Sequence, residues 1–222
     1  MDKNIVAIIQ ARVGSTRLPN KINMDLWGKT VLQRVVNRVG KSRLIDTIVL
    51  AMPDTIMDSK TFREMEIEGY LGREEDVLNR YWVCAKQFNA DIVVRITADC
   101  PLIDPEIIDK TICHFIRGKY DYVSNRLERP GFPDGQDVEV FRMEGLDLAE
   151  DFARDKKDRE HVTPYIKRNL NCGSLHAYSD FMDVRMTLDT WEDYWKLHEI
   201  VRRLIEKYGD DTWNLSQIMG VM

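Results

Sequence analysis

The stretch Ile8-Ile9-Gln10-Ala11-Arg12-Val13-Gly14-Ser15-Thr16-Arg17-Leu18-Pro19-Asn20-Lys21 decides how the rest of this chain is interpreted. It continues an apolar run, residues 5–9, that predicts a buried β-strand. Three cationic side chains, a glycine and two hydroxyls fall within the ten residues 12–21, where that strand ends. Ligands of open α/β sheets bind beyond the carboxyl ends of the strands, and a loop of this composition there suits a polyphosphate. The alternative interpretation is a solvated loop with scattered charge.

Working outward from this loop, strand-like and helix-like segments alternate over roughly the first 120 residues, which predicts βαβ units and a mainly parallel sheet. Apolar runs predict further buried strands at residues 47–52 and 92–96. Apolar residues at helical spacing predict helices around 31–39 and 77–88. Asp104 followed by Pro105 predicts a helix start, because a capping acid precedes a proline at the first helical position.

The second half of the chain has a different character. Residues 126–136 are rich in proline, glycine and charge, and indicate either an ordered active-site loop or a dimerisation excursion. The remaining expected elements are strands at 122–125 and 136–141, helices at 143–155 and 159–170, a hairpin or two strands at 173–188, and a helix opened by a Thr190–Asp193 capping box and ended at Gly209. Because no repeat or linker is evident, we expect one domain over 1–222, with 122–170 as an acceptor-binding or dimerisation subregion.

Composition narrows the class of protein. The 222 residues carry a formal net charge of −5, which argues against a general nucleic-acid binder. No apolar run approaches the roughly 20 residues that span a bilayer, and no signal-peptide pattern is evident, so no membrane partner is expected. Cys84, Cys100, Cys113 and Cys172 form no CxxC pair, which favours reduced thiols in a cytoplasmic protein. The four histidines share no ligand spacing with them, so a zinc site is not expected.

The first loop resembles the signature Ala-Arg-x-Gly-Ser-x-Arg-Leu-Pro-x-Lys of the cytidylyltransferases that make CMP-sugars. These are the CMP-KDO and CMP-sialate synthetases and their spore-coat polysaccharide (SpsF-type) relatives. The matching residues are Ala11, Arg12, Gly14, Ser15, Arg17, Leu18, Pro19 and Lys21, followed by Gly28-Lys29. A Walker loop is excluded, since Asn23 stands where that motif needs glycine. The resemblance implies a three-layer, Rossmann-like nucleotidyltransferase fold with a mainly parallel mixed sheet and a small dimerisation or acceptor excursion.

Two acids that follow expected strands are candidate metal ligands. Asp99 lies at the end of the 92–96 strand, where a carboxylate could hold Mg²⁺ together with substrate phosphates. Its segment resembles the Gly-Asp-x-Pro-Leu-Ile-x-Pro motif of CMP-KDO synthetases, with Ala98 in place of the glycine. Asp189 resembles the first acid of the family's Val-Asp-Thr-Pro-Glu-Asp, with Trp191 in place of the proline. The alternative for each acid is a structural role in a turn at the end of a strand.

Other segments resemble SpsF-type proteins and supply candidates for nucleoside and acceptor contact. Residues 72–81 match Gly-x-Glu-x-Asp-Val-Leu-x-Arg-Tyr and are expected near the nucleoside, although their acids also suit the first turn of a helix. Residues 133–141 and 158–165 are dense in polar groups, as suits a hydroxyl-rich or anionic acceptor. The acceptor candidates are Gln136, Glu139, Arg159, Glu160 and His161, with Asn125 and Arg126 as weaker ones.

The resemblance implies a nucleotidyl transfer in which an acceptor oxygen attacks the α-phosphorus of CTP and pyrophosphate leaves. It assigns Arg12 and Lys21 to the β- and γ-phosphates, and Asp99 and Asp189 to Mg²⁺, the one cofactor expected. These four residues are the catalytic candidates. The nucleotide-binding candidates are Gln10, Ala11, Arg12, Gly14, Ser15, Arg17, Lys21, Gly72, Glu74, Asp76 and Thr97. The expected partners are CTP, a small sugar-like acceptor and a second copy of the chain in a homodimer, and no histidine is identified as a general base.

Three alternatives stay open at this point. A nucleotide-sugar-dependent glycosyltransferase can share such a sheet, but usually carries an Asp-x-Asp pair, whereas this chain has Asp99-Cys100-Pro101. A nucleotidyltransferase that uses another nucleoside triphosphate has the same motifs. A non-catalytic protein that kept the fold is the third alternative, and it is disfavoured by Arg12, Lys21, Asp99 and Asp189 occurring together.

Overall fold

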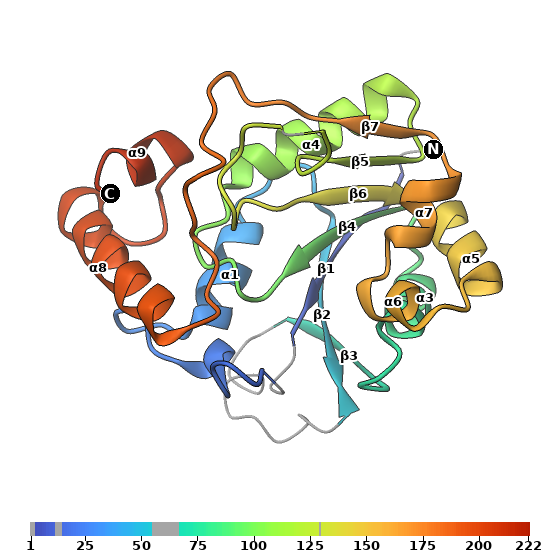
Figure 1. Ribbon diagram of the computed structural model, residues 1–222, viewed down its shortest axis with the longest axis horizontal. Coiled ribbons are helices and arrows are strands. Elements are labelled where there is room, and N and C mark those ends of the chain that lie inside the picture. The colour runs from blue at the N-terminus through green and yellow to red at the C-terminus, as the bar shows by residue number, and fades with distance from the viewer. Residues whose placement is uncertain (1–2, 12–14, 55–66, 129) are drawn as a thin grey trace.

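The computed structural model describes residues 3–11, 15–54, 67–128 and 130–222. Within these ranges, seven strands form one sheet in the order β3-β2-β1-β4-β6-β5-β7 (Figure 1). The strands are β1 (Ile5–Gln10), β2 (Thr47–Pro53), β3 (Glu68–Gly72), β4 (Ile92–Thr97), β5 (Tyr122–Ser124), β6 (Glu139–Arg142) and β7 (Cys172–Ser174). Only β6 runs antiparallel to its neighbours, β4 and β5, among these described strands. The expected mainly parallel mixed sheet is therefore confirmed.

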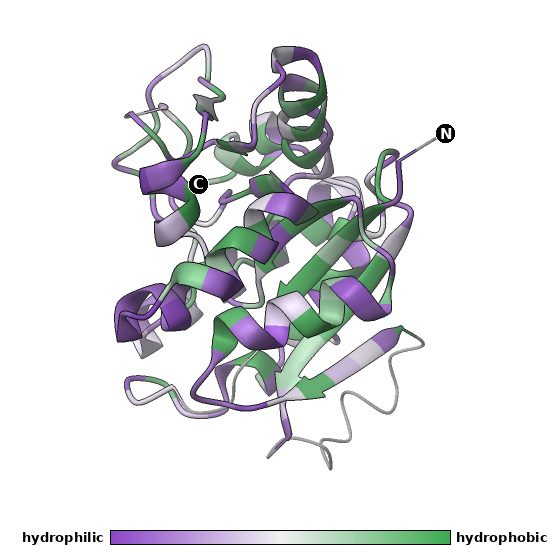
Figure 2. Cartoon of the chain, turned by 90° about the vertical axis from the view of Figure 1, so that its right-hand side faces the viewer, coloured by the Kyte–Doolittle hydropathy of each residue, from purple (hydrophilic) through white to green (hydrophobic). Residues whose placement is uncertain are grey.

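Helices cover both faces of the sheet, which gives the expected three layers. They are α1 (Val31–Val39), α3 (Val77–Gln87), α4 (Pro105–Gly118), α5 (Met143–Phe152), α6 (Lys156–His161), α7 (Pro164–Asn169), α8 (Trp191–Tyr208) and α9 (Leu215–Met219), with a short 3-10 helix η1 (Lys21–Asn23). The alternation of β1 explains the layers, since Ala7 and Ile9 pack with α1 and α4, whereas Val6 and Ile8 pack with α3 and α5. Figure 2 shows the strands and the inward helix faces as the most hydrophobic parts of the chain.

The predicted helix starts are confirmed where local capping chemistry is strong. The side chain of Asp104 accepts a hydrogen bond from the backbone N–H of Glu106 (2.8 Å) at the start of α4. Thr190 and Asp193 form the predicted capping box of α8, which ends before Gly209 as expected. These signals involve residues two or three positions apart, so they can be recognised without knowledge of the tertiary structure.

The hairpin or strand pair predicted at 173–188 is wrong beyond β7. Residues 175–190, here called the connector, form no further strand and cross toward α8 (orange in Figure 1). The reason is that the backbone of the connector forms hydrogen bonds mainly with an irregular loop, and its one backbone bond to itself, from Val184 to Phe181, is a turn in the described part of the chain. The backbone N–H groups of Ala177, Phe181 and Met186 donate to the carbonyls of Pro130, Gly131 and Asp134, at 2.7, 2.8 and 2.7 Å.

The helix predicted at 159–170 is also different, because the structure divides it into α6 and α7. Val162 lies between them with a φ of 69°, a left-handed conformation that interrupts a helix, and Pro164 starts α7. The helix predicted at 143–155 ends at Phe152. No described helix is both long and apolar enough to cross a lipid bilayer.

The topology gathers the chain's polar loops at one edge of the sheet. β1 and β4 are parallel and in register, with Gln10 beside Thr97, so the loops that follow both strands leave the same edge. Because β5 and β6 are antiparallel and Ser124 pairs with Glu139, β5 ends and β6 begins at that edge too. We call the described residues between them, 125–128 and 130–138, the edge loop.

Candidate active site

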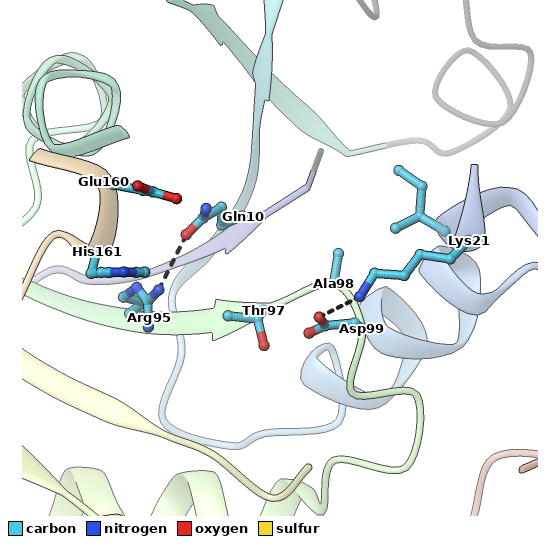
Figure 3. A pocket seen from close by; sticks show the side chains of 9 residues that line it. Gln10, Lys21, Arg95, Thr97, Ala98, Asp99, Glu160 and His161 are labelled. Atoms are coloured by element: carbon cyan, nitrogen blue, oxygen red, sulfur yellow. Dashed lines mark hydrogen bonds and ion pairs between the residues drawn. The ribbon is translucent and has the colours of Figure 1, made fainter. Parts of the chain in front are cut away.

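A cavity of about 150 Å³ lies where β1, β4, η1 and α6 meet. We call it the crevice; it is lined by Gln10, Lys21, Ile22, Arg95, Thr97, Ala98, Asp99, Glu160 and His161 (Figure 3). Arg95, Thr97 and Asp99 are two residues apart, so the alternation of β4 and the turn after it places them on one side of the sheet. Figure 3 shows Lys21 and Asp99 at one end of the crevice and Glu160 with His161 at the other.

The two predicted metal ligands, Asp99 and Asp189, meet at the first of these ends and are called the acidic pair. The Nζ of Lys21 donates to Asp99 Oδ2 (2.8 Å), Asp189 Oδ1 (2.9 Å) and the carbonyl of Leu188 (2.6 Å). The Lys21 side chain is only 7% exposed. The backbone N–H of Leu188 donates to the carbonyl of Asp99 (2.9 Å), which ties the connector to the turn after β4. A buried ammonium group therefore already lies between the two carboxylates.

Two arginines complete the surroundings of Asp189. Arg17 Nη2 lies 3.2 Å from Asp189 Oδ1, and Arg185 Nη2 lies 2.5 Å from Asp189 Oδ2. Burial raises the pKa of Asp189, but the hydrogen bond and charge of Lys21, the hydrogen bond of Arg185 and the charge of Arg17 outweigh it and hold this pKa below its usual value. Asp189 is therefore ionised at neutral pH, as a metal ligand must be.

The first loop is described only in part. Arg12 and Gly14 lie outside the described residues, so their predicted phosphate contacts stay predictions. Ala11 is buried and its backbone N–H donates to the carbonyl of Ala51 (3.2 Å). Ser15 Oγ accepts a hydrogen bond from the backbone N–H of Leu18 (3.4 Å). Of the two cations in the described part of this loop, Arg17 is exposed and Lys21 is buried.

Arg95 is a cation of the crevice that the sequence interpretation missed. Its Nη1 donates to Glu139 Oε2 (2.5 Å) and its Nη2 to Gln10 Oε1 (3.3 Å). The signal available in the sequence was a single charged residue inside the apolar run 92–96. A charged side chain on such an apolar strand needs a polar partner or a ligand. Arg95 is paired with Glu139, and it also lines the crevice.

Glu139, predicted to contact the acceptor, lies behind Arg95 and is buried. Its Oε1 accepts from Tyr122 Oη (2.6 Å) and Thr163 Oγ1 (3.0 Å), and Lys167 Nζ is 2.6 Å away. Burial raises the pKa of Glu139, but the charges of Arg95 and Lys167 outweigh it and lower the pKa from 4.5 to about 2. Glu139 therefore acts on the crevice through Arg95.

This lowered pKa predicts how stability depends on pH. A carboxyl group with a depressed folded-state pKa stabilises the protein above its unfolded pKa of 4.5, and this contribution is lost as pH falls toward about 2. The shift corresponds to about 3 kcal/mol. Urea unfolding from pH 6 to pH 3 should show a smaller loss of stability in Glu139→Gln than in the unchanged protein. Equal slopes for the two proteins would exclude this role of Glu139.

Gln136 holds loops together inside the protein. It is fully buried, its Nε2 donates to the carbonyl of Leu102 (2.7 Å), and its Oε1 accepts from the backbone N–H of Asp104 (2.8 Å). The predicted contact of Gln136 with an acceptor stays a prediction, to which these hydrogen bonds add no support. Its position joins the edge loop to the turn that carries Asp99.

A second cavity, of about 600 Å³, adjoins the crevice and brings together the segment after β3 and α6. It is lined by Arg73, Glu74, Glu75, Asp76, Val77, Arg80, Lys156, Arg159 and Glu160. Asp76 caps α3 by accepting from the N–H of Asn79 (3.1 Å), and it also pairs with Arg159 Nη2 (2.6 Å). Gly72 lies in β3, where an added Cβ would come within 3.0 Å of the Arg80 side chain. Glu160 borders both cavities, so the predicted nucleoside and acceptor residues are neighbours.

The donor set of the acidic pair restricts the kind of metal that fits. Over the described ranges, no three or more His, Cys, Asp or Glu side chains are grouped so that they could hold a metal ion. Two carboxylate ligands leave most of a coordination sphere to be filled by substrate and water. Magnesium is bound in this way, by one or two carboxylates together with phosphate oxygens.

Comparison with known proteins identifies the class to which this fold and site belong. The chain superimposes on a solved cytidylyltransferase from Leptospira borgpetersenii serovar Hardjo-bovis (strain JB197) with a TM-score of 0.90 and 30% identity, covering 99% of this chain and 94% of that one. A CMP:2-keto-3-deoxy-manno-octonic acid synthetase solved with CTP has the same fold, with a TM-score of 0.71, 15% identity and coverage of 90% and 99%. The protein is a nucleotidyltransferase.

The sequence narrows this class to one family. Residues 6–216 match the family model described as cytidylyltransferase. The spore coat polysaccharide biosynthesis protein SpsF of Bacillus subtilis (strain 168) is 33% identical over 222 residues, 93% of this chain and 88% of that protein. This chain belongs to the cytidylyltransferase family, which confirms the resemblance of its first loop and favours nucleotidyl transfer over the glycosyltransferase alternative.

Proposed function

We propose that this protein transfers CMP from CTP to a sugar-type or other anionic acceptor, with release of pyrophosphate and with Mg²⁺ as cofactor. The observation that carries the proposal is the acidic pair, held together at the carboxyl ends of the strands by the buried ammonium of Lys21. The likeness to SpsF supports a place in the synthesis of a surface polysaccharide or glycan.

Asp99 and Asp189 would hold the metal ion. The position between them selects a cation, since Lys21 Nζ lies within 2.9 Å of both carboxylates. Both ligands are oxygen atoms, and the open remainder of the sphere suits an ion that is also bound by triphosphate oxygens. When bound there, Mg²⁺ would neutralise phosphate charge and make the α-phosphorus a better electrophile.

The chain's own residues would position the reacting groups. Arg17 and Lys21 would bind the triphosphate, together with Arg12 of the first loop. An acceptor oxygen would form a bond to the α-phosphorus, in line with the breaking bond to the β-phosphate oxygen, and pyrophosphate would leave. Catalysis of this kind depends on positioning and charge neutralisation, so fixed cations beside the leaving group supply much of the rate.

The crevice would hold the acceptor near the α-phosphate. Glu160 and His161 offer polar contacts at the end opposite Lys21, and Arg95, which lies beside His161 in Figure 3, supplies a positive charge there. Arg159, Gln136 and Glu139 would support these contacts indirectly. Gln10 and Thr97, which line the crevice, and Glu74 and Asp76, which line the second cavity, are proposed nucleotide contacts, together with Ala11, Ser15 and Gly72 of the neighbouring segments.

The proposal also includes the cellular compartment of the protein, its domain organisation and its assembly. Cys84, Cys100, Cys113 and Cys172 are all free thiols, which supports a reducing compartment such as the cytoplasm. We also propose one domain over residues 1–222 and a homodimer formed through residues 122–170, with no nucleic-acid or membrane partner. Light scattering of the purified chain would measure the mass and test the dimer directly.

A thermal-shift comparison tests the choice of nucleotide. A ligand that binds the native state raises stability by about 2.7 kcal/mol at one hundred times its dissociation constant. CTP with Mg²⁺ should therefore raise the unfolding temperature more than UTP, GTP or ATP under the same conditions. If another nucleotide raised the unfolding temperature more than CTP, that nucleotide would be the substrate. If none of the four raised it, nucleotidyl transfer would be contradicted.

A further inference from the structure

Arg185 is a cation beside the acidic pair to which no sequence motif pointed. It lies in the connector and its guanidinium group pairs with three acids from different parts of the chain. Nη2 lies 2.5 Å from Asp189 Oδ2, Nε lies 3.2 Å from Asp193 Oδ1, and Nη1 donates to Asp134 of the edge loop. A planar guanidinium group has donors in a fixed fork, so it can hold several carboxylates at set angles.

These contacts decide which oxygen of Asp189 faces the crevice. Oδ2 is taken by Arg185, whereas Oδ1 is directed at Lys21 (2.9 Å) and Arg17 (3.2 Å). The backbone of Asp189 is fixed as well, because its N–H donates to Asp193 Oδ2 (2.9 Å). Since Arg185 also holds the other oxygen of Asp193, one side chain fixes both the carboxylate and the peptide group of Asp189.

Asp134 extends this arrangement to the edge loop. Its backbone N–H donates to the carbonyl of Val184 (2.9 Å), and its own carbonyl accepts from the N–H of Met186 (2.7 Å). The neighbouring Gly135 has a φ of 99°, and a Cβ there would lie 2.7 Å from the Met186 carbonyl carbon. The edge loop and connector therefore lie backbone against backbone on either side of Arg185.

We propose that Arg185 is a positioning residue that orients Asp189 toward the divalent cation and links this carboxylate to the edge loop. The inference rests on the proposed function, because it assumes that Asp189 holds the metal. Side chains that orient a metal ligand are worth about 10- to 100-fold in metal affinity or activity when they are replaced. Lysine at this position would keep the charge and lose the fork, so it should recover only part of the effect.

The test is Mn²⁺ binding, followed by electron paramagnetic resonance, in the full chain with CTP present. Arg185→Gln should weaken Mn²⁺ binding by about 10-fold or more, and Arg185→Lys by less. CTP binding measured in EDTA should stay within about twofold of the unchanged protein, because Arg185 acts on Asp189 and not on the nucleotide. Arg202→Gln is the matched control, since the described partners of Arg202 are Glu199 and Glu206 on its own helix, α8, and it should leave Mn²⁺ affinity unchanged.

Asp134→Asn gives a second, milder variant in case Arg185→Gln does not fold. It should weaken Mn²⁺ binding in the same direction by a smaller factor. Combined with Arg185→Gln it should cause no further loss, because Asp134 is inferred to act through Arg185. A full additional loss in the double variant would contradict the link between the edge loop and Asp189.

The outcomes separate this inference from the function on which it rests. Unchanged Mn²⁺ affinity in Arg185→Gln, with normal binding by the unchanged protein, would overturn the role of Arg185 and leave the metal site intact. An equal loss of CTP binding in EDTA would make Arg185 a direct phosphate ligand and overturn the positioning role. Failure of the unchanged protein to bind Mn²⁺ with CTP would overturn the metal site itself, and this role with it.

Discussion

Replacing either member of the acidic pair by asparagine should reduce pyrophosphate release by about three orders of magnitude. Asp99→Asn and Asp189→Asn each remove one anionic ligand from a site that has two. A bound cation contributes several kcal/mol to stabilising charge in the transition state, and about 4 kcal/mol corresponds to this factor. The measurement is initial rate against Mg²⁺ concentration, with CTP and an acceptor.

Folding should survive these substitutions, which makes the result specific to the reaction. Lys21 keeps the carbonyl of Leu188 and the remaining carboxylate as partners in each variant. We expect the unfolding free energy to change by about 1 kcal/mol. Asp151→Asn is the matched control, because Asp151 is an exposed acid on α5, and it should leave the rate unchanged. Near-normal turnover in Asp99→Asn or Asp189→Asn would remove that residue from the metal site.

Lys21→Met should have two effects of opposite sign. Turnover should fall by about 100-fold or more, because a fixed charge that stabilises the transition state is lost. Metal binding without nucleotide should rise, because the two carboxylates lose the ammonium group that lies between them. Removing one partner of a buried ion pair lowers the unfolding free energy by about 3–5 kcal/mol. Binding of Mn²⁺ alone should restore part of this stability.

The measurement is the unfolding temperature of the nucleotide-free protein with and without millimolar Mn²⁺. The unchanged protein should respond little, whereas Lys21→Met should gain several degrees. Lys110→Met is the control, because Lys110 forms a surface pair with Glu106 on α4 and has no part in the crevice. A metal response as small as that of the unchanged protein would show that Lys21 does not hold the metal position.

Local patterns predicted the elements that build the nucleotide edge of the sheet. The strands β1, β2 and β4 are short, mostly buried apolar runs, of which β1 and β4 end in a polar residue and β2 ends at Pro53. The capping groups of α4 and α8 act over two or three residues. Such features depend on sequence neighbours, so a single sequence contains the information that is needed.

The features that could not be predicted depend on contacts between distant residues. The connector alternates enough to suggest strands, but its hydrogen bonds go to an irregular loop some fifty residues away in sequence, as in the pair of Asp134 with Met186. Arg95 and Arg185 are isolated charges with partners far along the chain, Glu139 and Asp134. The meeting of Asp99 and Asp189 was predicted by family resemblance, whereas the physical tie between them, Leu188 to Asp99, is visible only in the structure.

Because β6 runs antiparallel to β5, the edge loop leaves and re-enters the sheet at neighbouring positions on one edge. The loop's two ends are closed together by Asn125, whose N–H donates to the Val138 carbonyl (3.3 Å) and whose Oδ1 accepts from the Val138 N–H (2.8 Å). Directly beyond this closure, Ser124 pairs with Glu139 in the ladder of β5 and β6. The entropy cost of a longer loop grows slowly, at about 0.6 kcal/mol for each doubling. A change in the length of this loop should therefore cost the sheet little, provided that the bonds of Asp134 and Gln136 to the connector and to the turn after β4 are kept.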